Sequence, residues 1–194
     1  MADCYLTVAG DGFAEIEEKR SRFLAYVSQV ATETEARAVV DRLRKQHWDA
    51  RHHCTAFRLG PRGDIERSND DGEPAGTAGA PMLEVVRGAG VSDVLVVVVR
   101  YFGGTLLGAG GLVRAYSSAA RAGLDEAGVR ERRLLTLWSL DVGLGDIGRV
   151  ENDLRSRGVV VEDVAYADRA TLRLATDALD LTDLGAVKEG ERWS

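Results

Sequence analysis

The sequence predicts an α+β protein of two domains, and three observations lead to this prediction. The chain has 194 residues, a length that suits one large domain or two small ones. Apolar patterns typical of strands alternate with patterns typical of helices along its length. Residues 135–194 carry 7 basic and 12 acidic side chains, whereas residues 1–134 are almost balanced in charge. We therefore expect an N-terminal domain over residues 1–134 and a C-terminal domain over residues 135–194.

Strand patterns in the N-terminal domain are short and separated in sequence. Alternation of apolar and polar residues predicts strands at residues 4–9, 23–30 and 54–59, the last ending in a glycine-proline turn. The unbroken apolar run at residues 94–99 predicts a strand that is covered on both faces or lies at the centre of a sheet.

Three helices are expected in the same domain. A capping box formed by Thr32 and Glu35 begins the first. A short helix is expected at residues 82–87 and a long one at residues 110–127, each with a single apolar face. Residues 68–81 are polar and glycine-rich, which is typical of a loop.

The C-terminal domain repeats a smaller pattern. Strands are expected at residues 135–142, 159–166 and 171–176, with a helix that ends at Gly158 between the first two. Leu181, Leu184 and Val187 suggest a last helix. The order β-α-β-β-α predicts a split βαβ, or ferredoxin-like, module, and leaves only residues 190–194 for its final strand.

Composition excludes several classes of function. The chain has 25 basic and 31 acidic side chains, so a generally basic surface for nucleic acid is excluded. Any contact with a polyanion needs a local basic patch. The longest apolar run is too short to cross a bilayer, and no signal peptide is visible. Two cysteines, Cys4 and Cys54, make no disulfide framework. We expect a cytoplasmic protein that does not insert into membranes.

The first candidate site is the loop that carries Asp70, Asp71 and Glu73, with Thr77 shortly after. Three carboxylates within four residues suit a hard cation such as Mg²⁺, although the spacing is not that of a calcium-binding EF-hand. The alternatives are a turn whose carboxylates cap backbone N–H groups, and a partner-binding or catalytic loop.

The second candidate site follows the buried strand and leads into the long helix. Arg100 at the end of the strand suits a phosphate or carboxylate contact. The glycines that follow, with the helix N-terminus, suit an anion site, or they only permit tight turns and close packing. The segment matches neither a Walker loop nor a dinucleotide fingerprint.

Two shorter clusters are secondary candidates. Lys19, Arg20 and Arg22 stand beside an aromatic residue, a combination that contacts RNA or simply protects a strand edge. His52 and Cys54 are expected on one side of a strand, where they suit a metal, a catalytic dyad or ordinary packing.

Four segments together closely resemble the IMPACT/YigZ family. They are residues 19–23 (KRSRF), 51–54 (RHHC), 70–81 (DDGEPAGTAGAP) and 100–113 (RYFGGTLLGAGGLV). The resemblance covers residues 15–130. It implies a two-layer α/β first domain like the second domain of a small-subunit ribosomal protein. It also implies a ferredoxin-like tail similar to the C-terminal domain of elongation factor G, with its last strand truncated here.

The resemblance also carries a functional expectation. Eukaryotic members regulate translation by competing for the activator of a kinase that phosphorylates an initiation factor. For bacterial members it implies a link to translation or nucleic acid and no established reaction. We therefore expect a non-enzymatic regulator of translation or stress response that binds a ribosome-associated protein or RNA. A protein fits the acidic loop better than bare RNA, because carboxylates near phosphate are unfavourable.

In this interpretation Arg100 contacts a phosphate or carboxylate, and the three loop carboxylates hold their loop or pair with Arg100. No catalytic residue, metal or cofactor is assigned. The alternative is an enzyme or a protein that binds a phosphate-containing small molecule with the same loops and Mg²⁺. The residues expected to bind the partner or anion are Asp70, Asp71, Glu73, Thr77, Arg100, Tyr101, Gly103, Gly104, Gly108, Gly110 and Gly111, with Lys19, Arg20, Arg22 and His52 as secondary candidates.

Overall fold

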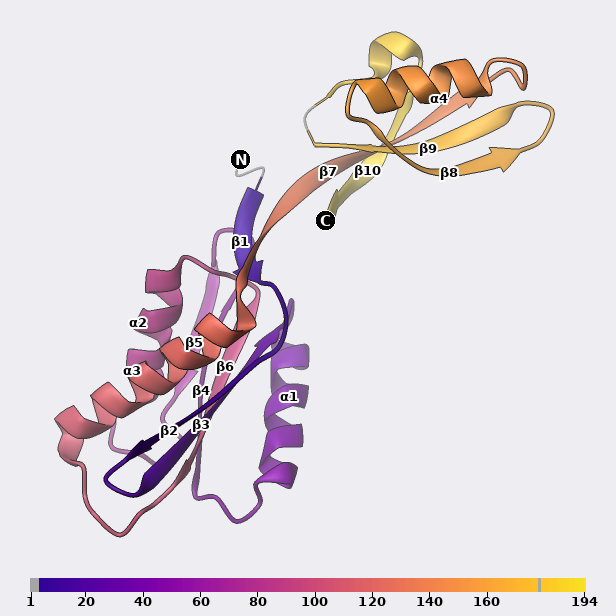
Figure 1. Ribbon diagram of the computed structural model, residues 1–194. Helices are drawn as coiled ribbons and strands as arrows, with labels where there is room; N and C mark the ends of the chain where they lie inside the picture. The colour runs from indigo at the N-terminus through magenta and orange to yellow at the C-terminus, as the bar shows by residue number, and fades with distance from the viewer. Residues whose placement is uncertain (1–3, 178) are drawn as a thin grey trace. The chain divides into compact units, whose positions relative to one another are not determined.

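The computed structural model describes residues 4–177 and 179–194 and divides the chain into two units. The first is Cys4–Glu131 and the second is Arg132–Ser194. Both mix strands and helices, as expected for the α+β class (Figure 1). The domain boundary between residues 134 and 135, inferred from charge, stays a prediction.

The N-terminal unit is built on a five-stranded antiparallel sheet in the order β2-β3-β6-β4-β5. Its strands are β2 (Gly12–Glu18), β3 (Ser21–Gln29), β4 (His52–Leu59), β5 (Ile65–Asn69) and β6 (Val94–Tyr101). Strand β6 lies at the centre and is buried along nearly its whole length, as its continuous apolar sequence predicts. Strand β1 (Cys4–Val8) lies outside this sheet: it pairs with β7 (Val129–Val142) in a second five-stranded sheet, and Leu6 also forms a bridge with Val91.

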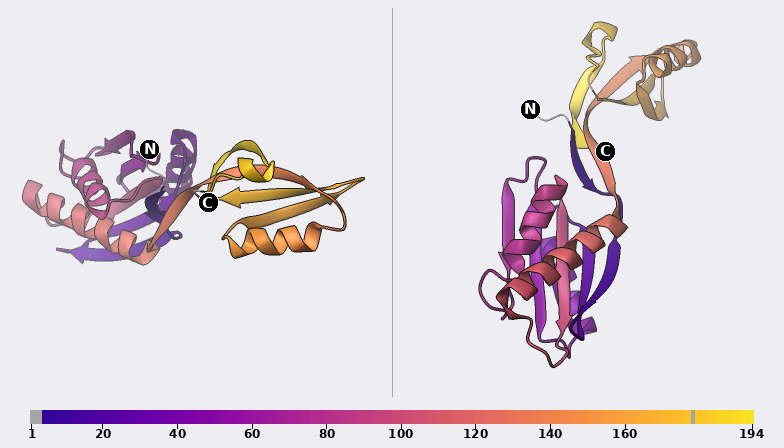
Figure 2. Two further views of the ribbon diagram at one scale, coloured as in Figure 1. Left: turned by 90° about the horizontal axis from the view of Figure 1, so that it is seen from above. Right: turned by 60° about the vertical axis from the view of Figure 1, so that its left-hand side comes forward.

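Helices cover both faces of this sheet (Figure 2). On one face α2 (Gly79–Ala89) and α3 (Gly108–Ala127) pack on alternate residues of β6 such as Val96 and Val98. On the other face α1 (Glu33–Gln46) packs on Val97 and Val99. The predicted mixed α and β first domain is confirmed, and its helices lie on both faces because a central strand that is apolar on both faces needs cover on both.

Local sequence accounts for the start of α1. The Thr32 hydroxyl accepts a hydrogen bond from the Glu35 amide at 3.1 Å, and the Glu35 carboxylate accepts one from the Ala31 amide at 2.7 Å. This capping box satisfies two helix-end donors and confirms the predicted start. The sequence did not predict two strands of this sheet. Strand β2 lies at the sheet edge, and β5 falls partly in the segment expected to be a loop.

The C-terminal unit contains a second antiparallel sheet in the order β10-β7-β9-β8. Strand β7 (Val129–Val142) begins in the first unit and is followed by α4 (Ile147–Ser156), β8 (Val160–Tyr166) and β9 (Ala170–Thr176). Leu154 and Leu172 are fully buried between α4 and the sheet. The order β-α-β-β agrees with the prediction for this part of the chain.

The end of the chain differs from its prediction. The last helix expected around Leu181, Leu184 and Val187 is only a 3-10 turn, η1 (Thr182–Leu184). Gly185, with a φ of +79°, ends this turn, and Val187 already belongs to β10 (Val187–Trp193). The final strand is therefore seven residues long and pairs with β7, with a bulge between Lys188 and Gly190. The expectation of a truncated strand is therefore wrong. The spacing of Leu181 and Leu184 predicted a longer helix, but these residues form only one turn, so the strand begins earlier than expected.

Candidate functional site

The two loops singled out in the sequence are joined by a buried ion pair. One guanidinium nitrogen of Arg100, at the end of β6, donates to the Glu73 carboxylate at 2.6 Å. Arg100 is 6% exposed and Glu73 is 8% exposed. The Arg100 guanidinium also lies 5.4 Å from the ring centroid of Phe23 and 5.7 Å from that of Phe102. This contact holds the loop after β5 against the loop after β6.

Helix α3 and strand β4 complete the environment of Glu73. The Tyr116 hydroxyl, from α3, donates to the same carboxylate oxygen at 2.7 Å, and burial raises the pKa of this tyrosine. Cys54 Sγ lies 3.3 Å from that hydroxyl, and it donates to the Asp70 carbonyl at 3.0 Å. Burial raises the pKa of the Cys54 thiol to about 12, so it stays protonated and unreactive.

His52 lies on the same side of β4 as Cys54, as the alternation of strand side chains predicts. Its Nδ1 donates to the Asp71 carbonyl at 3.0 Å, and its Nε2 lies 4.0 Å from the Glu73 carboxylate. The ring therefore holds the loop through its backbone on one side and faces the buried ion pair on the other.

Asp70 caps the N-terminus of α2. Its carboxylate accepts backbone hydrogen bonds from Gly76 at 2.8 Å, Ala78 at 3.1 Å and Gly79 at 2.8 Å. Burial acts to raise the pKa of Asp70, but these three hydrogen bonds outweigh it and lower the pKa. Among the alternatives open from sequence, Asp70 takes the role of a cap.

Asp71 connects the same loop to α1 and β4. Its carboxylate accepts from the Arg44 guanidinium at 2.6 Å and from the His53 backbone amide at 2.7 Å. Its own φ of +43° lies in the left-handed region, which aspartate tolerates better than most residues. Thr77 is also structural, since its hydroxyl donates to the Pro74 carbonyl at 2.7 Å.

Tyr101 belongs to a chain of hydrogen bonds at the surface. Its hydroxyl donates to Asp49 at 3.2 Å, so His47 Nδ1 donates to the Tyr101 oxygen at 2.9 Å. His47 Nε2 then accepts from the Tyr26 hydroxyl at 2.7 Å. Tyr101 is thereby fixed beside Arg22, whose guanidinium lies 5.7 Å from its ring centroid.

The glycines after β6 differ in what they do. A Cβ on Gly103 would lie 2.1 Å from the Arg20 backbone, so only glycine allows the β6–α3 loop to touch the β2–β3 turn. Gly104 and Gly108 adopt φ values of +86° and +71° with open space around them. Gly108, Gly110 and Gly111 form the first turn of α3, in which no side chain caps the backbone.

Lys19 and Arg20 form the two-residue turn between β2 and β3, and both side chains are exposed. The β2–β3 turn, the α1–β4 loop and the β6–α3 loop lie at one end of the N-terminal sheet (Figure 1). A hollow of about 240 Å³ at this end is lined by Asp49, Ala50, Arg51, Arg100, Tyr101 and Phe102. The structure thus brings the secondary candidates Lys19, Arg20 and Arg22 to the end of the sheet that carries the loop after β6.

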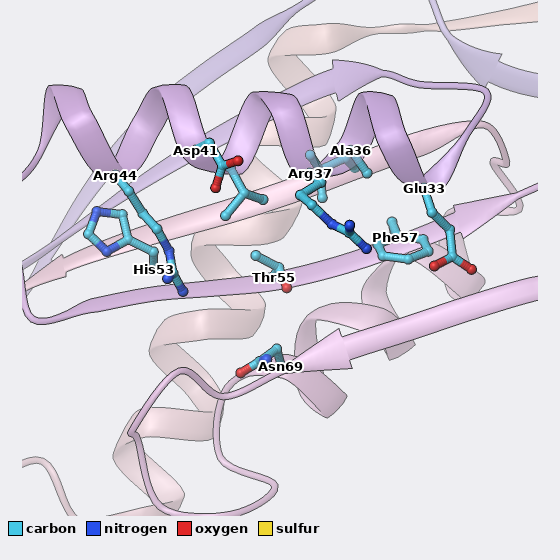
Figure 3. Close-up of a pocket in the computed structure, with 11 residues that line it drawn as sticks. Glu33, Ala36, Arg37, Asp41, Arg44, His53, Thr55, Phe57 and Asn69 are labelled. Atoms are coloured by element: carbon cyan, nitrogen blue, oxygen red, sulfur yellow. The ribbon is translucent and has the colours of Figure 1, made fainter.

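A separate groove of about 340 Å³ runs between α1 and strands β4 and β5. Figure 3 shows Arg37 and Arg44 extending from α1 over the groove, with Thr55 and Phe57 below them and Asn69 on the far side. Arg44 is engaged by Asp71. The residues that line the groove in the described part of the chain include none of the site residues predicted from sequence.

Sequence reasoning missed three side chains that shape the site. Tyr116 reads as one more apolar residue on the buried face of a helix, although its hydroxyl binds Glu73. Arg44 and His47 read as an ordinary basic helix end, although they bind Asp71 and Tyr101. No local signal identifies such residues, because each finds its partner on a distant segment.

No three His, Cys, Asp or Glu side chains within residues 4–177 and 179–194 are grouped as metal ligands would be. None of the helices in these ranges combines the length and apolar character needed to cross a bilayer.

Comparison with known proteins places this site in a family. Residues 19–124 match the Impact N-terminal domain, and residues 140–186 match a domain of unknown function, DUF1949. IMPACT family member YvyE of Bacillus subtilis is 42% identical over 168 residues, which cover 87% of this chain and 77% of YvyE.

More distant relatives and a solved structure also match. The protein IMPACT homolog of Saccharomyces cerevisiae is 34% identical over 119 residues, covering 57% of this chain and 45% of the yeast protein. A crystal structure of a hypothetical protein is 34% identical, with a TM-score of 0.68 over 95% of this chain and 89% of that chain. On the identity and coverage of these matches, the chain belongs to the IMPACT family.

Proposed function

We propose that this protein regulates translation by binding a ribosome-associated protein or RNA, without catalysing a reaction. Family membership supports a role in translation, since the eukaryotic members are expected to act there and the yeast homologue shares the N-terminal domain. The observation that carries the proposal is the buried Glu73–Arg100 pair. It joins the two signature loops, so that they present one surface to a partner.

The binding surface in this proposal consists of the exposed residues around that pair rather than the pair itself. Arg100 and Glu73 are buried and bind one another, so their role is to hold the loops in place. Tyr101, Phe102 and Arg51 border the hollow beside them. Exposed aromatic and arginine side chains are the residue types that contribute most to binding surfaces.

For the C-terminal unit we propose a ferredoxin-like fold that acts as an acidic docking module. The support is its element order and a composition of 12 acidic against 7 basic side chains over residues 135–194. A basic partner would complement this charge.

Sucrose-gradient sedimentation of native lysate tests the proposal. Wild type is expected to travel with ribosomal particles, whereas a Phe102→Ala/Arg51→Glu variant stays at the top of the gradient. Arg62→Glu, on the β4–β5 turn at the opposite end of the sheet, is the matched control and should travel like wild type. Arg100→Ala is a poor probe because it leaves the buried Glu73 without its cation. Wild type that stays at the top at low salt contradicts ribosome binding.

The hollow of about 240 Å³ favours one second candidate, a small phosphate-containing ligand. Arg51 and Arg100 line it, and arginine suits phosphate. A thermal-shift screen with nucleotides, phosphosugars and Mg²⁺ separates the two functions. A ligand at 100 times its Kd stabilises the protein by about 2.7 kcal/mol, and no shift across the panel would exclude this candidate.

A further inference from the structure

Two basic residues form the tip of the β2–β3 hairpin in a conformation that disfavours them. Lys19 and Arg20 have φ values of +48° and +65°. Glu18 pairs with Ser21, so the connection is a two-residue loop with both φ values positive, which is a type I′ turn. Asn-Gly suits this turn best, and side chains with an ordinary Cβ are strained in it. The chain therefore has two cations at positions where Asn and Gly would be less strained.

The strained tip is continuous with the exposed part of the signature loops. The Arg20 backbone packs directly on Gly103, and the Gly103 amide donates to the Ser21 hydroxyl at 3.1 Å. Phe102, the preceding residue, is 52% exposed. Arg51 borders the same hollow as Phe102. We call Lys19, Arg20, Arg51 and Phe102 the tip surface.

The tip surface is positively charged although the whole chain is acidic. In the described ranges 4–177 and 179–194, no carboxylate lies within 4.0 Å of a Lys19, Arg20 or Arg51 side-chain nitrogen. Arg22, nearby, is already paired with Glu15 at 2.6 Å.

The carboxylates of the signature loop do not cancel this charge. Asp70 is engaged by three backbone amides, Asp71 by Arg44 and Glu73 by Arg100. Of the other acids nearby, Asp49 borders the hollow, Glu17 lies opposite Arg22 across the two strands, and exposed Glu18 directly precedes Lys19. Because the three loop carboxylates are already engaged by neighbouring groups, they do not oppose RNA binding in the way that the sequence alone predicts.

We infer that the tip surface binds single-stranded RNA. Lys19, Arg20 and Arg51 contact phosphates, and the Phe102 ring stacks on a base. Single strands suit this surface because their unstacked bases offer a face to an exposed aromatic ring. A strained turn made of two basic residues is explained if their charge is needed for binding. The inference rests on the proposed function and names RNA as the partner.

Fluorescence anisotropy with a labelled 12-nucleotide oligouridine and the full chain tests the inference. Three phosphate contacts on a single strand predict an affinity loss of about 20-fold between 50 and 200 mM salt. The variant Lys19→Asn/Arg20→Gly retains the favoured turn and removes both charges. It should bind weakly, with a salt effect of only about threefold. Arg62→Asn, on the opposite turn, should bind as wild type does.

Stacking and strand type have their own readouts. Phe102→Leu should weaken binding at both salt concentrations and leave their ratio unchanged, because it removes no charge. A duplex of the same length should bind less tightly than the single strand. Thermal melting of Lys19→Asn/Arg20→Gly should occur at or above the wild-type temperature, so lost binding cannot be attributed to unfolding.

Two results would overturn the inference. One is a Lys19→Asn/Arg20→Gly variant that binds oligouridine with wild-type affinity and salt response; the other is wild type that binds no RNA at 50 mM salt. Sedimentation with ribosomes distinguishes failure of the RNA inference from failure of the proposed function. If wild type sediments with ribosomes but binds no RNA, the partner is a protein and only the RNA inference falls. If wild type binds RNA but never sediments with ribosomes, the RNA contact stands and the proposed function falls.

Discussion

Replacing Glu73 with Gln tests whether the buried ion pair holds the two signature loops together. Gln has nearly the same shape and can still accept a hydrogen bond from the Tyr116 hydroxyl. The change therefore isolates the loss of the charge that faces Arg100 at 2.6 Å. Both partners are more than nine-tenths buried, so water cannot replace the missing carboxylate. Leaving a buried charge without its partner costs about 3–5 kcal/mol, a large part of the stability of a domain this size.

The measurement must report on the N-terminal unit alone, since two units need not unfold together. Hydrogen exchange of amides in β6, the central strand of that unit, gives its opening free energy directly. Tyr116→Phe, which removes one donor to the same carboxylate, should cost less, about 1.5–3 kcal/mol. Replacing both ionic partners by Leu and Met should cost less than Glu73→Gln. A Glu73→Gln protein within about 0.5 kcal/mol of wild type would refute this reasoning.

Four further predictions follow from the same contacts. Asp70 has a lowered pKa in the folded protein, so its stabilisation is complete above about pH 4 and lost as the pH falls through the folded value. Asp70→Asn should remove this acid-dependent part of a urea-unfolding free energy. A thiol reagent should modify exposed Cys4 quickly but Cys54 only after unfolding, as mass spectrometry will show. Lys19→Asn/Arg20→Gly should raise the unfolding free energy by about 1 kcal/mol, because it relieves left-handed strain. Gly103→Ala should lower the melting temperature through its clash with the Arg20 backbone.

Sequence patterns predicted the elements whose burial follows a simple period. The run of valines in β6 needs cover on both faces, and the structure places it at the sheet centre. The capping box at Thr32 uses contacts within four residues, so it can be read without knowing the fold. Leu154 and the glycine that follows α4 fit the same rule, because a helix face and its end are local properties.

The elements that were missed lack such a local signature. Strand β2 lies at one edge of the sheet, and its alternation is hidden because its more buried positions hold Gly12 and Ala14 while Phe13 is exposed. Strand β5 lies at the other edge and is mostly exposed. Strand β10 is polar and is held by its pairing with β7, about 50 residues earlier in the chain. Propensity cannot predict a strand whose stability comes from a distant partner.

The sequence predicted the site only in part, and the reason is similar. The residue types of the loop after β5 indicated carboxylates that cap, pair or bind, and could not say which carboxylate does which. Spatial neighbours decide this: Asp70 lies at the start of α2, Asp71 reaches Arg44, and Glu73 reaches Arg100. The expectation that loop carboxylates hold the loop or pair with Arg100 agrees with these contacts.

Buried residues of the signature loops stabilise the site, whereas exposed residues are available to bind a partner. A partner cannot bind Glu73 or Arg100 without first breaking a desolvated ion pair, and that cost would have to be recovered from the new contact. Lys19, Arg20 and Phe102 carry no such cost, because they are already exposed. Substitutions of the buried pair should therefore change stability and binding together. Substitutions of the exposed residues should weaken binding without lowering stability, and this difference identifies the surface that meets the partner.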